Sequence, residues 1–568
     1  MIRQNKNIRG IRIGKERVCL LQYADDTVLF LDGSEKSLKS ALDLLFQFSK
    51  FSGLKPNISK TKAIWIGSKA QSSDTLSNDS GILWTTEPFN ILGIIYTANL
   101  CNIVQLNFDE KLATLQKEIN QWSKRNISPI GKIIIIKSLL LSKLTHLFLS
   151  LPRPDASWIK RLETLFFKFI WGGKNDKIAR KTMQLDLETG GCRMININTF
   201  IKSRKLTWIR RLLIKDSEWS NLLTETTHCN ITHLSQCGAD YPRQKAHSTS
   251  NIFWKETLLY FAEFISIVQH KNTQTLLEPL WYNDKIQIQN KSVFYKNMYE
   301  NGFHLISDLL DENGNFMKFD DFKHKINKLP FTLYEGLKKA ILRSWPDVRN
   351  TAANQVLQPY QSSVIRILTR DKKGSRSIYK CFNELSNHRP ICELKWETDL
   401  GLPTTFNWEK VYKSIMCTTK DTGLIWFALR IIHRIIGTKV YLNKLKISDD
   451  KYCSICLHEP ESITHLFFDC PLVARIWSSL SFWILQKTGK RIHFDKETVI
   501  LGHMSDDKII NLIIMLVKKC IFSLSRKKNL ITFTDIVRYL QTYYAYEKKM
   551  FETEVFFKRW SNWNLLFE

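Results

Sequence analysis

The chain has 568 residues, which is too long for one compact core and predicts several domains. Hydrophobic residues make up 44% of it and charged residues 24%, proportions that exclude wholesale disorder, collagen and a disulfide-stabilised miniprotein. Lys and Arg number 83 against 54 Asp and Glu, and the net charge of +29 favours a polyanionic partner, either nucleic acid or an acidic membrane surface.

The first segment, Met1–Gly14, is basic and lacks the continuous apolar run of a signal peptide, so we expect a protein that is not secreted. The most apolar stretch, Gly131–Leu151, is interrupted by three lysines and a histidine, and no run of 18 uncharged apolar residues occurs elsewhere. Most of the cysteines are scattered, as is typical of reduced thiols. These features predict an intracellular protein, in the nucleus or the cytoplasm, with no membrane partner.

Two short apolar runs, Cys19–Tyr23 and Val28–Leu31, flank the acidic pair Asp25 and Asp26 and predict a β-hairpin. Adjacent carboxylates at the tip of a hairpin repel each other and are unfavourable to desolvate, and a divalent cation relieves both effects. Mg²⁺ is held by one or two carboxylates together with substrate phosphates, and two such ions can align a hydroxyl with a nucleotide phosphate. A plain turn is the alternative interpretation, because Asp favours turns through hydrogen bonding alone.

Beyond the hairpin, apolar residues between Leu38 and Phe48 recur at roughly helical spacing, and Gly53 is expected to end that helix. The Ser- and Asp-rich stretch Gly67–Gly81 predicts a surface loop. The apolar stretch Phe89–Tyr96 predicts a further strand.

From Asn107 the periodicity becomes helical, and further helices are expected over 131–149 and 158–171. Residues 111–181 contain 15 Lys and Arg against 4 Asp and Glu, a local surplus of +11. This density favours phosphate contacts over merely solvated helix faces. The candidates for such contacts are Lys124, Arg125, Lys132 and Lys137.

The polar stretch Thr224–Asn251 predicts a domain junction. It contains Cys229, His233 and Cys237, whose spacing fits no tight zinc knuckle, so we expect these residues to be unliganded. The chain after about residue 250 is expected to be mostly helical.

A second cluster of cysteines has the spacing of a metal site. Cys453 and Cys456 are followed by His465 and Cys470, which is the pattern C-x2-C-x8-H-x4-C. Three thiols and an imidazole this close together match a tetrahedral structural Zn²⁺ site, and reduced cysteines that happen to be neighbours are the alternative. His458 follows Cys456 too closely to be a ligand.

Three segments in fixed order resemble the reverse transcriptase of LINE-type non-LTR retrotransposons, from its catalytic hairpin onward. They are Gln22–Ser37 (QYADDTVLFLDGSEKS), Phe51–Gly67 (FSGLKPNISKTKAIWIG) and Phe89–Ile94 (FNILGI). The resemblance continues over 122–154, which is similar to the thumb, through FIWGG at 169–173 and Gly190-Gly191, and more loosely over about 425–520.

The resemblance implies RNA-directed DNA polymerisation by two-metal nucleotidyl transfer, with Asp25 and Asp26 as the carboxylates that hold Mg²⁺. It implies that Tyr23 lies near the primer terminus or template and that Lys60 approaches the phosphates of the incoming nucleotide. The implied partners are an RNA template and a DNA primer or target. The Cys/His motif resembles one near the end of the same proteins, where it is associated with nucleic-acid binding.

The sequence departs from that family ahead of the hairpin. In the family a third carboxylate and the nucleotide-holding fingers lie upstream, and the first 19 residues contain one acidic side chain, Glu16, and nothing like either. We therefore expect a truncated, C-terminal portion of a polymerase, which holds Mg²⁺ weakly. The alternatives are a catalytically dead nucleic-acid-binding remnant, made of thumb and zinc knuckle, and a fragment whose unpaired strand edges prevent stable folding.

The resulting prediction for the fold is an α+β chain with a partial right-hand palm, a mostly helical thumb and a C-terminal region that carries a small zinc knuckle. The predicted domains are the palm at 1–100, the basic helical thumb and its extension at 101–210, a connecting helical region at 211–425 and the C-terminal region at 426–568.

Overall fold

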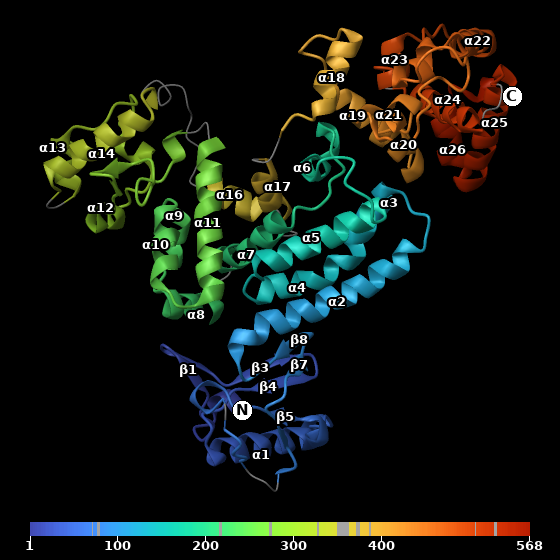
Figure 1. The fold of residues 1–568 in the computed structure, drawn as a ribbon. Helices are drawn as coiled ribbons and strands as arrows, with labels where there is room; N and C mark the ends of the chain where they lie inside the picture. The colour runs from blue at the N-terminus through green and yellow to red at the C-terminus, as the bar shows by residue number, and fades with distance from the viewer. Residues whose placement is uncertain are drawn as a thin grey trace. The chain divides into compact units, whose positions relative to one another are not determined.

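The computed structural model describes residues 1–70, 72–76, 80–214, 218–271, 275–326, 329–348, 363–370, 375–384, 388–505, 507–527 and 531–567. The chain is mostly helical (Figure 1). It divides into two compact units, each assembled from three separate stretches of sequence. Unit 1 comprises Met1–Thr114, Lys143–Lys160 and Ile197–Leu385, and unit 2 comprises Leu115–Ser142, Arg161–Asn196 and Ser386–Glu568.

The strands of the first hundred residues form separate two-stranded pairs. The pairs are β1 (Ile11–Ile13) with β2 (Glu16–Val18), β3 (Leu20–Tyr23) with β4 (Asp26–Leu29), β5 (Lys62–Ala63) with β6 (Leu83–Trp84), and β7 (Phe89–Ile91) with β8 (Ile94–Tyr96). Only β5 and β6 run parallel among these. Among the described residues the pairs do not join into the continuous sheet that a palm implies, so the palm remains a prediction.

Helix α1 (Glu35–Ser52) follows the second strand pair, as the apolar spacing predicts. The Ser34 hydroxyl accepts a hydrogen bond from the backbone N–H of Ser37 and caps the helix start. Gly53 ends the helix with a φ of 74°, a left-handed conformation that glycine adopts without steric penalty. Leu38, Ala41 and Leu42 form the buried face of the helix.

The prediction of one strand over Phe89–Tyr96 is wrong, because this stretch folds back on itself as the β7–β8 hairpin. Leu92 and Gly93 make the turn, with φ angles of 50° and 80°. The Asn90 side chain accepts a hydrogen bond from the Gly93 N–H at 2.8 Å and holds the turn closed.

The helices assigned to unit 1 pack around aromatic side chains, and α2 and α5 contribute residues to both units. Phe108, Phe148 and Trp158 stack within about 5–6 Å of one another and join α2, α4 and α5. The larger helices are α2 (Ile103–Ser123), α4 (Ser142–Ser150), α5 (Ala156–Trp171), α7 (Ile197–Ile214), α11 (Ile252–Lys271) and α14 (Phe331–Ser344). The shorter elements are α8 (Glu218–Thr227), α9 (Ile231–Gln236), α10 (Asp240–Ser248), β9 (Gln287–Ile288), β10 (Lys291–Ser292), α12 (Lys296–Glu300), α13 (Phe319–Lys325), α16 (Ser363–Arg370) and α17 (Arg376–Glu384).

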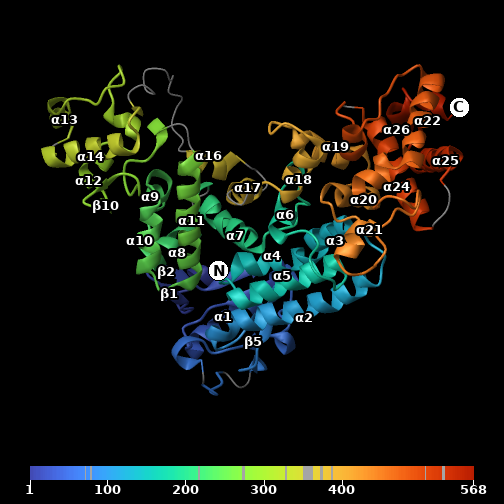
Figure 2. The ribbon, with the colours of Figure 1, turned by 45° about the horizontal axis from the view of Figure 1, so that its top comes forward.

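The polarity of Thr224–Asn251 predicted a domain junction, but this stretch lies inside unit 1. It forms the end of α8 together with α9 and α10, and α10 packs along α11 in both views (Figures 1 and 2). Its few apolar side chains, among them Leu234 and Tyr241, are buried in one hydrophobic cluster. Sparse apolar residues at the right spacing were therefore sufficient to bury these short helices.

Unit 2 is built from helices whose segments alternate with those of unit 1 along the chain. Its elements are α3 (Pro129–Ile135), a π-helical turn η6 (Ile136–Leu140), α6 (Arg180–Gln184), α18 (Ile391–Leu400), α19 (Trp408–Thr418), α20 (Thr422–Ile432), α21 (Lys439–Lys444), η10 (His465–Asp469), α22 (Pro471–Thr488), α23 (Lys496–Leu501), α24 (Lys508–Arg526), α25 (Phe533–Met550) and α26 (Thr553–Trp560). The hydroxyls of Ser128 and Thr422 hydrogen-bond at 2.8 Å and join the starts of α3 and α20. Helix α24 is buried over most of its length and forms the centre of the unit.

Among the described residues, no single helix combines the length and the apolar composition that crossing a membrane requires. The segments Pro129–Leu140 and Ser142–Ser150 meet that requirement only when taken together, and they are bent by 47° relative to each other.

Candidate metal centre

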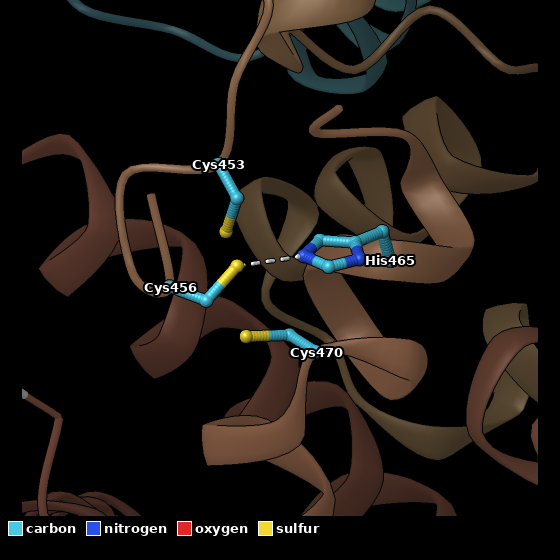
Figure 3. A group of neighbouring side chains, drawn as sticks. All are labelled: Cys453, Cys456, His465 and Cys470. Carbon is cyan, nitrogen blue, oxygen red and sulfur yellow. Dashed lines mark hydrogen bonds between the residues drawn. The ribbon is translucent and has the colours of Figure 1, made fainter. Parts of the chain in front are cut away.

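Three cysteines and one histidine of unit 2 converge on a common point. One potential ligand atom from each of Cys453, Cys456, His465 and Cys470 lies within 4.8 Å of every other, and the side chains face one another (Figure 3). The Sγ atom of Cys456 is 3.4 Å from Nε2 of His465. Since Zn–S bonds of about 2.3 Å place tetrahedral ligands about 3.8 Å apart, a small contraction around an ion suffices to complete the site.

The turn that carries the first two cysteines is fixed by backbone hydrogen bonds. The Cys453 N–H donates to the carbonyl of Glu459 at 2.7 Å, and the Ile455 N–H donates to Sγ of Cys453 at 3.4 Å. Leu457 adopts a left-handed φ of 65° and turns the chain back toward the bridge between Tyr452 and Pro460. The two sulfurs are thus presented from one tight loop.

The other two ligands come from the start and the end of a π-helical turn. The Ser462 hydroxyl accepts a hydrogen bond from the His465 N–H at 3.0 Å, and the Cys470 N–H donates to the His465 carbonyl at 2.9 Å. Pro471 then begins α22, where its missing N–H is not needed. The wide π turn brings the imidazole and the last thiol to the same side of the chain.

Burial makes the centre a structural rather than a solvent-open site. Cys453 and Cys470 are fully buried and His465 is buried, whereas Cys456 is half-buried. A hydrogen bond between the two buried thiols raises the pKa of Cys453 to about 12 and lowers the pKa of Cys470. A divalent cation supplies the charge that keeps such thiols deprotonated.

Helices on both sides of the motif hold it in place. The indole N–H of Trp477 in α22 donates to the carbonyl of Phe467 at 2.7 Å. Lys496 of α23 forms an ion pair with Asp469 at 2.8 Å, and Phe427 of α20 packs edge-on against Phe467. The metal centre is consequently part of the core of unit 2 and not a detached finger.

Glu461 is a residue of this centre that the sequence analysis did not single out. It lies between Cys456 and His465 and is fully buried, although it is acidic. Its carboxylate pairs with the guanidinium of Arg526, which sits at the end of α24. Two glutamates, Glu459 and Glu461, lie between the ligands in the sequence, and nothing in the spacing indicated which of them is buried.

The Gly190-Gly191 turn packs against the helices that precede the centre. A Cβ atom at Gly190 would lie 2.6 Å from the phenol ring of Tyr412, and one at Gly191 would lie 2.0 Å from the carbonyl oxygen of Leu185. The Tyr412 hydroxyl donates to the buried carboxylate of Glu393 at 3.0 Å. Gly190 therefore allows α19 to approach the backbone closely, and Gly191 allows the turn to close against Leu185.

The thiol of Cys392 and the imidazole of His433 lie next to Tyr412, but the thiol is not an activated nucleophile. The Sγ atom of Cys392 is 3.5 Å from Nδ1 of His433. Burial raises the pKa of Cys392 to about 11 and lowers the pKa of His433 to about 4. Both groups are neutral near pH 7, so the pair does not form the thiolate that covalent catalysis needs.

The acidic hairpin forms as predicted, with one difference in register. Tyr23 pairs with Asp26 across the strands, so the turn consists of Ala24 and Asp25, and Ala24 has a left-handed φ of 52°. Tyr23, Asp25 and Asp26 are all exposed. Within the described part of the chain, the Cys/His cluster is the one group of three or more potential ligands that meets at a point, so no third carboxylate joins this pair.

The basic candidates differ in how freely they face solvent. Lys60, in the single turn Ile58–Lys60, is exposed, and so are Lys124 and Arg125 after the end of α2. The Arg125 guanidinium lies 4.5 Å from the ring centroid of Trp122. Lys137 is exposed on η6.

Lys132 is engaged within unit 2. Its ammonium donates to the carbonyl of Phe169 at 2.9 Å and lies over the same residue's ring. Burial lowers the pKa of Lys132.

The residues Cys229, His233 and Cys237 lie in unit 1, away from the Cys/His cluster in the chain. Cys229 and Cys237 are buried, and His233 packs against tyrosine rings.

Residues 375–477 match the family described as zinc-binding in reverse transcriptase. The matched range contains all four residues of the Cys/His cluster and ends within α22. The match and the geometry of the cluster together support zinc binding and a relation of this chain to reverse transcriptases. The acidic hairpin lies outside the matched residues.

Proposed function

We propose that this chain is a portion of a non-LTR retrotransposon reverse transcriptase whose zinc-stabilised C-terminal unit binds nucleic acid. The observation that carries the proposal is the buried Cys₃His cluster inside the residues that match the reverse-transcriptase zinc-binding family. Cys453, Cys456, His465 and Cys470 would hold Zn²⁺, which supplies the charge that keeps the thiols deprotonated and fixes the loop. The net charge of +29 supplies the attraction to phosphates.

Exposed cations near the end of α2 supply the first phosphate contacts in this proposal. Lys124 and Arg125 follow one another in the exposed turn after Ser123, without an acidic residue between α2 and α3. Lys137 adds a third exposed cation on η6. Each phosphate contact made by such a side chain steepens the dependence of affinity on salt by about 0.7 to 0.9 in log–log slope.

Binding of single-stranded RNA and of an RNA–DNA primer–template, measured by fluorescence anisotropy over a range of KCl concentrations, tests this function. We expect the double variant Lys124→Ala/Arg125→Ala to weaken binding and to reduce the salt slope by about 1 to 2. The matched control is Lys39→Ala/Lys296→Ala, which removes the same charge from exposed lysines paired with Glu35 and Glu300. Equal effects of the two double variants would show that only net charge matters and would contradict these contacts.

A second candidate function is polymerisation itself, and the exposed Asp25 and Asp26 at the tip of a hairpin favour it. For this function Asp25 and Asp26 would hold Mg²⁺, which would supply positive charge to the phosphates of an incoming nucleotide. Primed RNA template, dNTPs and Mg²⁺ should then yield primer extension, and Asp25→Asn should abolish it while leaving RNA affinity unchanged. Tight, salt-dependent binding without primer extension would contradict polymerisation and support nucleic-acid binding as the single function.

A further inference from the structure

The Glu461 carboxylate connects three parts of unit 2 at the metal centre. Its Oε1 accepts a hydrogen bond from the Lys439 N–H at 2.9 Å, where α21 begins. Its Oε2 accepts a hydrogen bond from the Ser454 N–H at 3.4 Å, inside the Cys453–Cys456 turn. Arg526 at the end of α24 supplies the positive charge. One carboxylate therefore satisfies donors from three separate segments.

The backbone of Glu461 strengthens the same connections. Its N–H donates to the carbonyl of Lys451 at 2.8 Å, and its carbonyl accepts from Val440 at 3.3 Å. The residue thereby braces the strand-like arm that leads into Cys453. Ser454 stands between the first two ligands, so its hydrogen bond to Glu461 acts on the turn that carries both sulfurs.

A fully buried carboxylate is unfavourable unless its charge is compensated. Glu461 is 0% exposed, and the compensation comes from Arg526, whose guanidinium also lies over the ring of Phe522 at 4.9 Å. Removing the carboxylate would leave an arginine and two backbone N–H groups without their acceptor. Such an arrangement persists when it fixes a geometry that the fold needs.

We propose that Glu461, held by Arg526, is a positioning residue of the metal centre and couples metal binding to α24. This inference rests on the proposed zinc site. The carboxylate fixes the Cys453–Cys456 turn for the metal, and the ion pair carries the effect to a helix that lies beyond the family match, which ends at residue 477. Partners that orient metal ligands typically change metal affinity by 10- to 100-fold when they are removed.

The test measures zinc affinity of the full chain by competition with a chromophoric chelator, and ligand geometry by the Co²⁺ absorption spectrum. We expect Glu461→Ala to raise the zinc Kd by about 10- to 100-fold and to shift the Co²⁺ bands. Glu461→Gln, which keeps one acceptor oxygen, should have a smaller effect. The matched control is Glu459→Ala, because Glu459 is an exposed glutamate of the same loop and its backbone carbonyl, which accepts from the Cys453 N–H, is kept by the substitution.

A second pair of variants tests the connection to α24. Arg526→Met should weaken zinc binding and remove the zinc-dependent protection of α24 amides against hydrogen exchange, whereas Arg526→Lys should restore part of both. Lys527→Met is the control, since Lys527 is the exposed neighbouring cation. If Glu461→Ala fails to fold, Glu461→Gln and Arg526→Met carry the test.

The possible outcomes separate this inference from the proposed function. A wild-type chain that binds less than about one Zn²⁺ removes the zinc site itself. Wild-type zinc binding together with Kd values within twofold for Glu461→Ala and Arg526→Met overturns the positioning role alone. A merely structural role for Glu461 would lower the melting temperatures of the zinc-free and zinc-loaded chains equally and leave the Kd unchanged.

Discussion

The acidic hairpin and the Cys/His centre both suggest metal binding, yet the two regions are built differently. Asp25 and Asp26 stand exposed at the end of a ribbon of two four-residue strands. The four ligands of the Cys/His centre converge in the interior of unit 2, and the buried Glu461 carboxylate, paired with Arg526, braces their loop. A motif whose ligands all lie within residues 453–470 completes itself locally, whereas a motif that needs ligands from distant segments depends on the rest of the fold.

Loss of one zinc ligand should have the largest effect and provides the strongest test of this comparison. We expect Cys453→Ser to reduce bound zinc well below one ion per chain and to lower the free energy of unfolding of unit 2 by more than about 3 kcal/mol, because metal binding there contributes to folding. Metal analysis and thermal unfolding with and without a chelator measure both effects. Cys417→Ser, at an exposed cysteine of the same unit, is the control and should change neither.

The unit that holds the Cys/His centre also buries a lysine, whereas the carboxylates of the acidic hairpin are exposed. Burial lowers the pKa of Lys518 in α24 from 10.5 to about 7, and its only hydrogen bond among the described contacts goes to the Ile500 carbonyl at 3.1 Å. The unfolded chain therefore binds more protons between pH 7 and 10.5, so stability should rise with pH in that window, by at most about 1.4 kcal/mol per pH unit. Lys518→Met should flatten this rise in denaturant titrations.

The control for that experiment is Lys519→Met, which changes the neighbouring, partly exposed lysine of the same helix. A pH dependence of Lys518→Met that equals that of the wild type would contradict the burial of a neutral amine at this position.

Two glycines of unit 2 provide a test, with a smaller expected effect, of how tightly the segments of this unit pack. Gly190 and Gly172 both have left-handed φ angles, 82° and 62°, but only Gly190 has a side chain within 4 Å of its built Cβ position. Alanine at either position pays for the left-handed backbone, about 1 kcal/mol, and Gly190→Ala adds a clash with Tyr412 of about 1–3 kcal/mol. Denaturant midpoints of the two variants should differ accordingly, and equal midpoints would mean that α19 does not press on this turn.

The smallest effect on stability is expected at the acidic pair. Asp25→Asn and Asp26→Asn remove like charges from an exposed tip and should change the free energy of unfolding by less than about 0.5 kcal/mol. Chemical denaturation measures this change. A loss above 1 kcal/mol for either variant would show that these carboxylates have structural partners, and the contrast with the zinc ligands would fail.

Local sequence signals predicted several elements well. Gly53 ends α1 as expected, and the spacing of the Cys/His motif identified a cluster whose ligand atoms converge. The prediction of a single strand over 89–96 was wrong, because the pattern of apolar residues does not reveal that Leu92 and Gly93 adopt a left-handed backbone conformation. That conformation is stabilised by the neighbouring Asn90 side chain, which the apolar pattern ignores.

Contacts between distant segments lay beyond sequence reasoning. The approach of Tyr412 to Gly190 and the pairing of Glu461 with Arg526 join residues that are far apart in the chain. Composition marks these residues only as a small residue or a charge, and burial decides their role. The polar stretch 224–251 illustrates the same limit, because its own composition does not reveal that its helices pack against α11 and the rest of one hydrophobic cluster.

The threefold division of unit 2 has a consequence for synthesis on the ribosome. Leu115–Ser142 and Arg161–Asn196 emerge first, but their partners begin only at Ser386, after all of 197–385 has been translated. At a translation rate of about 5–20 residues per second, α3 and the Gly190-Gly191 turn remain without their partners for tens of seconds in the nascent chain. A chaperone that shields them during this interval should raise the yield of folded protein more than one supplied after release.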